Sequence, residues 1–271
     1  MTSPIVALWC WYHGGPFKGY QTQPGLPTVQ DAVIAALQAA GLTRKPLPAG
    51  RTDAGVHARM QVLSLRLPEP IDLEHLPGRI NAHLPQSVRI TLARPAARGF
   101  HPQYSSTGKE YRYQLLTREL GAWAPYGWRI DVDPARLRPL LESVVGTRDF
   151  GAFHDRTSNR MPRTVERVEL LEPGAGRLEV RMSGPGFARY MVRLLVGSAV
   201  AVARGELSES DFRAGLDTAK KISEVRAPAA GLTLWEVRYA AGADPFSATE
   251  RTEAPGVPPE PPFHWLDPPA T

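Results

Sequence analysis

An aspartate in a glycine-rich segment is the first place in this chain where chemistry is expected. Asp53 lies in the run G-R-T-D-A-G (residues 50–55), just before a segment with strand character. Loops that rigid strands hold in place often carry function, and a carboxylate can act as a nucleophile or assist proton removal. The same run is also typical of a local turn in which Asp53 bonds the backbone, so the motif alone leaves both interpretations open.

An arginine at the head of a long apolar run is the second candidate. Arg193 is followed by ten uncharged residues, 194–203, which predict a mostly buried helix. A buried guanidinium requires a carboxylate partner, and such a pair lowers the pKa of the carboxylate and keeps it ionised. The alternative is that Arg193 lies at the edge of the helix and reaches water.

A tyrosine on a predicted strand is the third candidate. Tyr111 lies in G-K-E-Y-R-Y-Q (residues 108–114), where it shares one strand face with Tyr113. Aromatic side chains on strands can stack on nucleic-acid bases. They are more often part of a hydrophobic core, and the strand pattern by itself does not decide between the two.

The elements that position these residues follow from hydrophobic patterning and from capping residues. Strands are predicted over residues 5–12, 61–67, 87–94, 109–116, 164–171, 177–183 and 232–240. Helices are predicted over residues 28–41, 134–145, 187–203 and 208–216, with a short one within 73–83. Thr28 is expected to cap the first helix, with Asp31 at the capping-box position.

This order of elements favours an α+β fold with largely antiparallel sheets over a doubly wound one. Two α/β domains are predicted, residues 1–105 and 106–240, with the boundary near residues 100–107. Residues 241–271 hold 8 of the 27 prolines and are expected to form an extended or disordered acidic tail.

The charge distribution favours a polyanionic partner. The chain carries 32 basic and 27 acidic residues, a net charge of +5. Residues 241–271 contain five acidic residues and Arg251, a net of −4, so residues 1–240 carry +5 − (−4) = +9. Such a basic body suits nucleic acid, although composition bias toward arginine would produce the same count.

Several classes of protein are not supported by the sequence. Cys10 is the single cysteine, which excludes a disulfide framework and a cysteine-based zinc site. The histidines form no close metal pair, and no phosphate loop or dinucleotide fingerprint is present. The longest uncharged apolar run has ten residues, too short for a bilayer. With no secretory leader pattern, a cytoplasmic location, no metal and no membrane partner are expected.

Together these segments resemble the tRNA pseudouridine synthase A (TruA) family. The resemblance runs from Tyr12 to Tyr239 in the family's order, and several motifs carry it. These are Y-H-G-G-P-F-K-G-Y-Q-T-Q (12–23), G-R-T-D-A-G-V-H-A (50–58), F-H (100–101), K-E-Y-R-Y (109–113), G-T-R-D-F (146–150), R-T-V (163–165), G-F (186–187), M-V-R-L-L-V-G (191–197) and A-P-A-A-G-L (227–232). The pattern differs at His13, at Pro102-Gln103 and over residues 220–226.

The resemblance implies isomerisation of uridine to pseudouridine in tRNA, in the anticodon stem-loop at positions 38, 39 and 40. It makes Asp53 the catalytic aspartate, Tyr111 the active-site tyrosine and Arg193 the arginine that pairs with the aspartate. It assigns Arg51 to holding the target base out of its stack. His57 and Lys109, which lie in the matching motifs, are expected to contact the substrate.

The resemblance also implies two ferredoxin-like (RRM-like) halves, with a central basic cleft and Asp53 at its floor, and a homodimer that grips one tRNA. The reaction involves no redox change, so no cofactor is expected. A free aspartate has a pKa of about 3.9 and is ionised at neutral pH, whereas tyrosine, with a pKa of about 10, suits stacking or proton transfer in a desolvated site.

Two other functions are weighed against this one. A non-catalytic RNA-binding or RNA-chaperone protein that kept the fold would also use the basic body, but pure binding does not require the intact motif around Asp53. A hydrolase with paired carboxylates lacks a second carboxylate in a comparable motif. Binding without product would indicate the first alternative, and release of free uracil the second.

Overall fold

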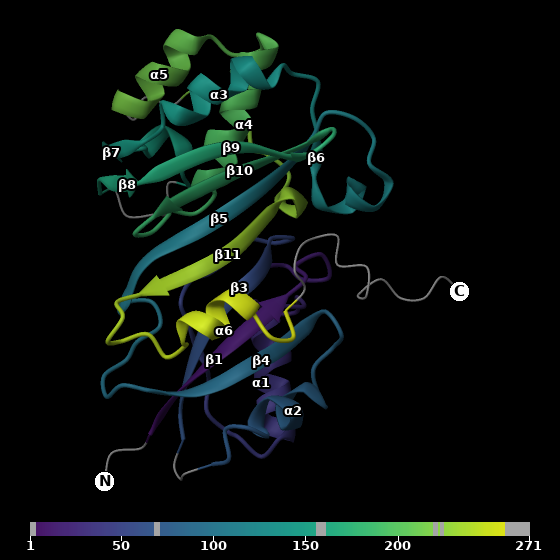
Figure 1. Ribbon diagram of the computed structural model, residues 1–271, viewed down its shortest axis with the longest axis vertical. Helices are drawn as coiled ribbons and strands as arrows, with labels where there is room; N and C mark the ends of the chain where they lie inside the picture. The colour runs from purple at the N-terminus through teal and green to yellow at the C-terminus, as the bar shows by residue number, and fades with distance from the viewer. Residues whose placement is uncertain (1–3, 68–70, 156–160, 219–221, 223–224, 258–271) are drawn as a thin grey trace. The chain divides into compact units, whose positions relative to one another are not determined.

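The computed structural model describes residues 4–67, 71–155, 161–218, 222 and 225–257 (Figure 1). The chain divides into two compact units. The first unit comprises Met1–Thr107 together with Leu234–Thr271, and the second comprises Gly108–Thr233. Each unit is built from antiparallel strands with helices packed against them.

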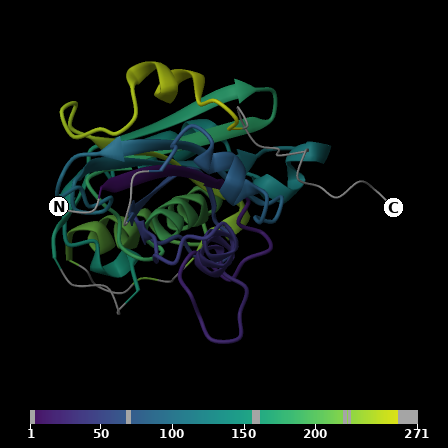
Figure 2. The ribbon, with the colours of Figure 1, turned by 90° about the horizontal axis from the view of Figure 1, so that it is seen from below.

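The first unit is built on strand β1, whose eight residues are all buried. Its elements are β1 (Ile5–Tyr12), α1 (Val29–Ala39), β2 (Leu47–Pro48), β3 (His57–Arg66), α2 (Leu76–Asn81), β4 (Val88–Ala96), β11 (Leu232–Tyr239) and α6 (Ala248–Glu253). The strands lie in the order β4-β1-β3-β11, and β2 also pairs with β3. Helices α1 and α6 lie on opposite faces of these strands (Figures 1 and 2), which explains why β1 is apolar throughout.

The second unit holds a sheet in the order β5-β10-β9. Its elements are β5 (Ser106–Leu116), η1 (Gly121–Tyr126), β6 (Trp128–Arg129), α3 (Pro134–Glu142), β7 (Gly146–Arg148), η2 (Gly151–Phe153), β8 (Arg163–Val165), β9 (Arg167–Gly174), β10 (Arg177–Gly184), α4 (Met191–Arg204), α5 (Glu209–Thr218) and η3 (Ala229–Gly231). Every residue of α4 except Arg204 is buried, and α4 packs against one face of the sheet (Figures 1 and 2).

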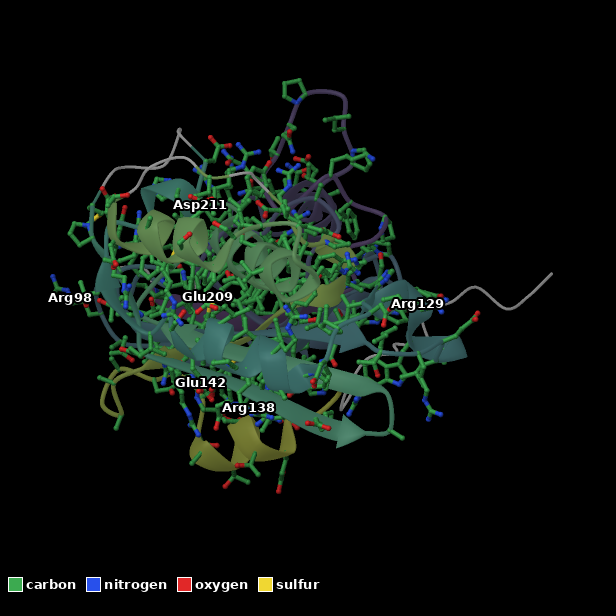
Figure 3. All side chains as sticks on the ribbon, turned by 90° about the horizontal axis from the view of Figure 1, so that it is seen from above. Arg98, Arg129, Arg138, Glu142, Glu209 and Asp211 are labelled. Carbon is green, nitrogen blue, oxygen red and sulfur yellow. The ribbon has the colours of Figure 1, made fainter. Side chains whose placement is uncertain are left out.

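The outer helices of the second unit are fixed by polar contacts. Figure 3 shows Arg138 on α3, and its guanidinium Nη1 donates to the carbonyl oxygen of Leu170 on β9 at 2.7 Å. The same figure marks Glu209 and Asp211 in the first turn of α5. The backbone N–H of Asp211 donates to the Ser208 hydroxyl at 3.1 Å, as the capping pattern predicts.

The predicted fold class is confirmed. The succession β1-α1-β2-β3-α2-β4 is ferredoxin-like, and the chain continues with a similar succession, β5-α3-β9-β10-α4-β11, whose last strand belongs to the first unit from Leu234 onward. Thr28 caps α1 by accepting from the backbone N–H of Asp31. The long apolar helix begins at Met191 instead of residue 187, because Tyr190 adopts a left-handed conformation.

The C-terminal region differs from the expected domain organisation. Residues from Leu234 onward belong with the first unit, whereas the second domain was predicted to continue to residue 240. Residues 241–257 contain α6 and pack on that unit, although an extended or disordered tail was expected over 241–271. Six of the eight tail prolines lie in residues 258–271, outside the described residues, so the proline count misled the prediction for the part before them.

Candidate active site

The loop that carries Asp53 is clamped to β3 by a buried glutamine. Gln61 is fully buried, and its side-chain oxygen accepts from the backbone N–H groups of Ala49 (3.1 Å) and Gly50 (3.3 Å). Its side-chain nitrogen donates to the carbonyl oxygen of Gly50 at 2.7 Å. A buried amide with both ends satisfied fixes the start of the loop relative to the strand.

Thr52 anchors the residue next to Asp53. Its hydroxyl lies 2.8 Å from the phenol oxygen of Tyr12, and its carbonyl oxygen accepts from the backbone N–H of Tyr20 at 3.1 Å. On the other side, the carbonyl oxygen of Asp53 accepts from the backbone N–H of Val56 at 3.1 Å. The backbone of Asp53 is therefore held from both directions, while its side chain is half-buried.

Two glycines from the preceding loop let that loop approach the loop of Asp53 closely. A Cβ at Gly14 would lie 2.1 Å from the carbonyl oxygen of Val56. At Gly19, φ is +105° and a Cβ would lie 3.1 Å from the carbonyl oxygen of Thr52. Only glycine fits both sites without displacement, which gives a physical reason for the glycines of the 12–23 motif.

The structure places His57 beneath the loop rather than on its surface. His57 is only 1% exposed, and its Nδ1 accepts from the backbone N–H of Gly14 at 3.0 Å. Its ring stacks on His13 with the centroids 4.7 Å apart. The expected substrate contact of His57 does not agree with this burial, and His57 is better interpreted as a residue that positions the loop. Arg51 is exposed, as a contact with a polyanion requires.

In the second unit, Tyr111 lies on β5 in contact with an aromatic ring. Tyr111 pairs in register with Met182 on β10, and its ring meets that of Phe187 edge to face at 5.4 Å between centroids. The residue is 9% exposed. Its ring is therefore held in one orientation by packing, which a stacking or proton-transfer role requires.

Lys109 lies two residues before Tyr111 and is also 9% exposed. Burial lowers the pKa of Lys109 from 10.5 to about 8, because desolvation disfavours the charged ammonium. A lysine with this pKa still carries its charge at neutral pH. Lys109 can therefore act as a cation toward phosphate, although part of its charge is lost as the pH passes 8.

Arg193 lies in the first turn of α4 and is oriented by the segment that follows α5. Its Nε donates to the carbonyl oxygen of Ala227 at 2.8 Å, and the backbone N–H of Ala227 donates back to the carbonyl oxygen of Arg193 at 3.1 Å. The first bond uses one of the five donors of the guanidinium and fixes its plane. Arg193 is 9% exposed, so the interpretation in which it reaches freely into water is wrong.

The same segment is tied down by Tyr113. Its phenol, fully buried, donates to the carbonyl oxygen of Pro228 at 2.8 Å, and burial raises the pKa of Tyr113. A Cβ at Gly197 would lie 2.0 Å from the carbonyl oxygen of Val225, so the segment crosses α4 at close range. Tyr113 is thus a structural residue, whereas its neighbour Tyr111 on the same strand face borders the surface.

The predicted site residues therefore fall into two groups. Asp53 and Arg51, in one loop, and His57, at the start of β3, belong to the first unit, whereas Tyr111, Lys109 and Arg193 belong to the second unit. The pairing of Asp53 with Arg193 and the basic cleft stay predictions. No cluster of three or more potential metal ligands occurs in the described part of the chain, and none of its helices is long and apolar enough to cross a membrane.

Sequence reasoning missed the residues that hold the loop. Gln61, Tyr12 and Thr52 were placed in strands or in the motif without a role of their own. A signal is present for Gln61, because in the strand predicted over residues 61–67 it has the same parity as the apolar residues Leu63 and Leu65, which are expected to face inward. A polar residue at an inward position must find hydrogen-bond partners, and here the loop provides them.

Comparison with known proteins first defines the class. The sequence model of the tRNA pseudouridine synthase family matches residues 140–240. This match includes β10, α4 and the A-P-A-A-G-L segment, and therefore the surroundings of Arg193. One solved structure, of the archaeal box H/ACA sRNP Nop10-Cbf5 complex, matches at a TM-score of 0.35 and 15% identity over 71% of this chain and 44% of that one.

The curated relatives define the family more closely. tRNA pseudouridine synthase A of Bacillus pumilus (strain SAFR-032) is 34% identical over 242 residues, 84% of this chain and 96% of the relative. The same enzyme of Thermosynechococcus vestitus (strain NIES-2133 / IAM M-273 / BP-1) is 34% identical over 259 residues, 92% of this chain and 90% of the relative. The chain belongs to the tRNA pseudouridine synthase A family.

Proposed function

We propose that this protein isomerises uridine to pseudouridine in the anticodon stem-loop of tRNA, with Asp53 as the nucleophile. Family membership gives the activity class, a tRNA-uridine isomerase. The observation that supports the finer assignment is the clamped loop of residues 49–56. It presents one carboxylate on a backbone to which Gln61 and Tyr12 are hydrogen-bonded and against which Gly14 packs closely.

The reaction requires a carboxylate that is held in a fixed position more than one that is unusually reactive. A carboxylate attacks the sugar or the base, or assists proton removal from the ribose, while the N-glycosidic bond breaks and the ribose is rejoined to C5. The hydrogen on C5 leaves as a proton and N1 takes up a proton, so the reaction is an isomerisation with no change of oxidation state. After the N-glycosidic bond breaks, the uracil must offer C5 to the ribose in place of N1. A small displacement of the attacking carboxylate would therefore slow the reaction. The hydrogen bonds on both sides of Asp53 meet that requirement.

We assign Arg193 as the ion-pair partner of Asp53 and Tyr111 as the residue that contacts the uracil. Both are mostly buried, and each is oriented by a neighbour, Ala227 for Arg193 and Phe187 for Tyr111. A buried guanidinium whose plane is fixed presents its remaining donors in one direction, as pairing with a carboxylate requires. Arg51 and Lys109 are proposed to contact the RNA, at the base and at a phosphate respectively.

The target base must leave its stack before it can react, at a cost of a few kcal/mol. Contacts from basic side chains to the tRNA backbone offset that cost, and the net charge of +9 over residues 1–240 favours such contacts. We further propose a homodimer that binds one tRNA and a cytoplasmic location, where tRNA is matured. Mass measurement of the purified protein in solution, alone and with tRNA, tests the dimer.

The central test compares Asp53→Asn with wild type on an unmodified tRNA transcript. Asparagine keeps the shape of the side chain and removes the negative charge, so we expect loss of product by about 10⁴-fold or more with tRNA binding retained. The matched control is Asp131→Asn, an exposed aspartate of the second unit, which should leave the rate unchanged. Chemical labelling of pseudouridine maps the modified positions.

Two outcomes contradict parts of the proposal. Equal product from wild type and Asp53→Asn removes the nucleophile assignment. Tight tRNA binding by wild type without product on any tRNA indicates the non-catalytic RNA-binding alternative. Product at positions outside 38, 39 and 40 keeps the reaction and replaces the proposed target.

A further inference from the structure

Three arginines surround a single tyrosine ring in the second unit. The guanidinium carbon of Arg226 lies 4.4 Å from the ring centroid of Tyr190, that of Arg189 lies 4.6 Å from it, and that of Arg193 lies 5.7 Å from it. The Nη2 atom of Arg189 also donates to the Tyr190 phenol at 2.7 Å. Cation–π contact with one arginine is common, but three guanidinium groups around one ring is a concentration of like charge.

The backbone at this ring is strained. Tyr190 precedes α4 and has φ of +66°, in the left-handed region that favours glycine. A bulky aromatic residue in this region costs free energy, and such residues occur preferentially at functional sites. The first turn of α4 is nevertheless formed, because the backbone N–H of Leu194 donates to the carbonyl oxygen of Tyr190 at 2.9 Å.

The three arginines at Tyr190 differ in the contacts that they make within the described residues. Arg189 lies 3.4 Å from the carboxylate of Asp155. Arg193 is buried and bonded to Ala227. Arg226 is exposed, and no carboxylate in the described part of the chain lies within ion-pair distance of it. The quadrupole of the phenol ring steadies the guanidinium groups without neutralising them.

We propose that Arg226 and Arg189, held on Tyr190, bind a phosphate group of the RNA substrate next to the target nucleotide. This inference rests on the proposed function. A guanidinium is a planar fork of donors that matches phosphate oxygens, and stacking on a ring leaves the edge of the fork available for them. The place beside the target follows from Arg193, which contacts the same ring and is assigned to the catalytic aspartate.

The inference gives a role to Arg226, a residue that the family resemblance left unexplained. Arg226 ends the residues 220–226, over which this chain differs from the family's pattern. Residues 219–221 and 223–224 lie outside the described residues, but Arg226 precedes Ala227, whose backbone is bonded to Arg193. Arg226 is therefore attached to the segment that orients the buried arginine.

The experiment is a salt series of tRNA binding and turnover with Arg226→Ala. We expect the Kd and KM for a tRNA transcript to rise about 3- to 10-fold and kcat to stay within a factor of two. The slope of log Kd against log salt should fall by about 0.7–0.9, the value for the removal of a single phosphate interaction. Arg136→Ala is the matched control, because it removes one exposed arginine from α3 of the same unit.

Two further variants test the guanidinium group of Arg226 and the ring of Tyr190 separately. Arg226→Lys keeps the charge and loses the fork, so it should retain the salt slope and recover only part of the affinity. Tyr190→Asn keeps a residue that tolerates positive φ and removes the ring, so it should weaken binding about as much as Arg226→Ala. The double variant Tyr190→Asn/Arg226→Ala should then bind tRNA about as weakly as either single variant, since both substitutions remove the same phosphate contact.

The results distinguish this inference from the proposed function. If wild type forms pseudouridine and Arg226→Ala matches Arg136→Ala in Kd and salt slope, the phosphate site is overturned and the function stands. If wild type forms no product while Arg226→Ala still lowers the salt slope, the phosphate site stands and the function fails. A lower kcat at unchanged Kd would also overturn the site, because it would show that Arg226 acts through Arg193 alone.

Discussion

At the scale of single residues, the candidate site depends on polar neighbours that are buried beneath the loop of Asp53. Gln61 closes three hydrogen bonds with Ala49 and Gly50, and His57 is buried under Gly14. Each of these groups would be costly to bury without its partners. The hydrogen bonds of the buried polar groups beneath the loop thus fix the position of Asp53. Mutations of these groups should change the rate of pseudouridine formation more than the affinity for tRNA.

Gly14→Ala tests this positioning directly. The new Cβ would lie 2.1 Å from the carbonyl oxygen of Val56, so the loop must move. We expect kcat to fall by about 100-fold, since a displacement of about 1 Å has effects of that size, with little change in Kd for tRNA. The control is Gly78→Ala in α2, where a Cβ meets nothing within 4 Å. Equal rates for the two variants would contradict the positioning role.

Lys109 should make the free energy of unfolding depend on pH. The pKa of Lys109 is about 8 in the folded protein and 10.5 in the unfolded chain, which takes the ordinary value. Between pH 8 and pH 10.5 the unfolded chain therefore binds more protons than the folded protein, and the free energy of unfolding rises with pH. Lys109→Met removes this titration. At pH 7 the variant should be more stable than wild type, by on the order of 3 kcal/mol, and the difference should shrink toward pH 10.

Urea denaturation at several pH values in this range measures the effect. Lys45→Met, at an exposed lysine of the first unit, is the control and should show a difference that does not vary with pH. A constant difference for Lys109→Met as well would mean that Lys109 keeps its ordinary pKa in the fold.

At the scale of elements, the segment of residues 241–257 is part of the first unit. Phe246 is 3% exposed and meets Trp9 edge to face at 5.5 Å between centroids. Arg251 bonds Asp244 at 2.7 Å and Glu236 on β11 at 3.0 Å, and its side chain is mostly buried. Glu250 closes a capping box with Ser247 and pairs with Arg94 on β4. Burial opposes ionisation of Glu250, but these bonds outweigh it and lower its pKa.

Two truncations follow from this packing. A chain that ends at Ala240 loses Phe246 and Arg251, and we expect its free energy of unfolding to fall by about 3 kcal/mol or more, as for loss of a buried aromatic. A chain that ends at Val257 keeps both side chains, so we expect it to be more stable than the chain that ends at Ala240 by that amount. Chemical denaturation of the two truncated proteins measures the difference. Equal stability of the two would contradict the packing of residues 241–257 on the first unit.

At the scale of the whole molecule, the acidic C-terminal region and the basic body are not separate. The region from residue 241 carries −4 and residues 1–240 carry +9, but Glu250 pairs with Arg94 of the body. Glu250 therefore neutralises one basic side chain of the first unit. The tRNA contacts proposed above use other arginines, Arg51 in the first unit and Arg226 in the second.

The sequence alone determined the class of fold, most of the elements and the family resemblance that names the candidate residues. A continuous apolar run predicted β1, alternation predicted β5, and the Thr28–Asp31 pattern predicted the start of α1. These features are local: each depends on residues close together in the chain, which a pattern can record.

Only the tertiary structure decided how those residues are held. The bond from Gln61 to Gly50 spans 11 positions, that from Tyr12 to Thr52 spans 40, and that from Arg94 to Glu250 spans 156. The strained backbone of Tyr190 and the arginines around it likewise appear only when distant segments pack together. A hydrogen bond or a ring contact between distant residues leaves little trace in composition or periodicity, because its partners are chosen by the fold and not by their spacing.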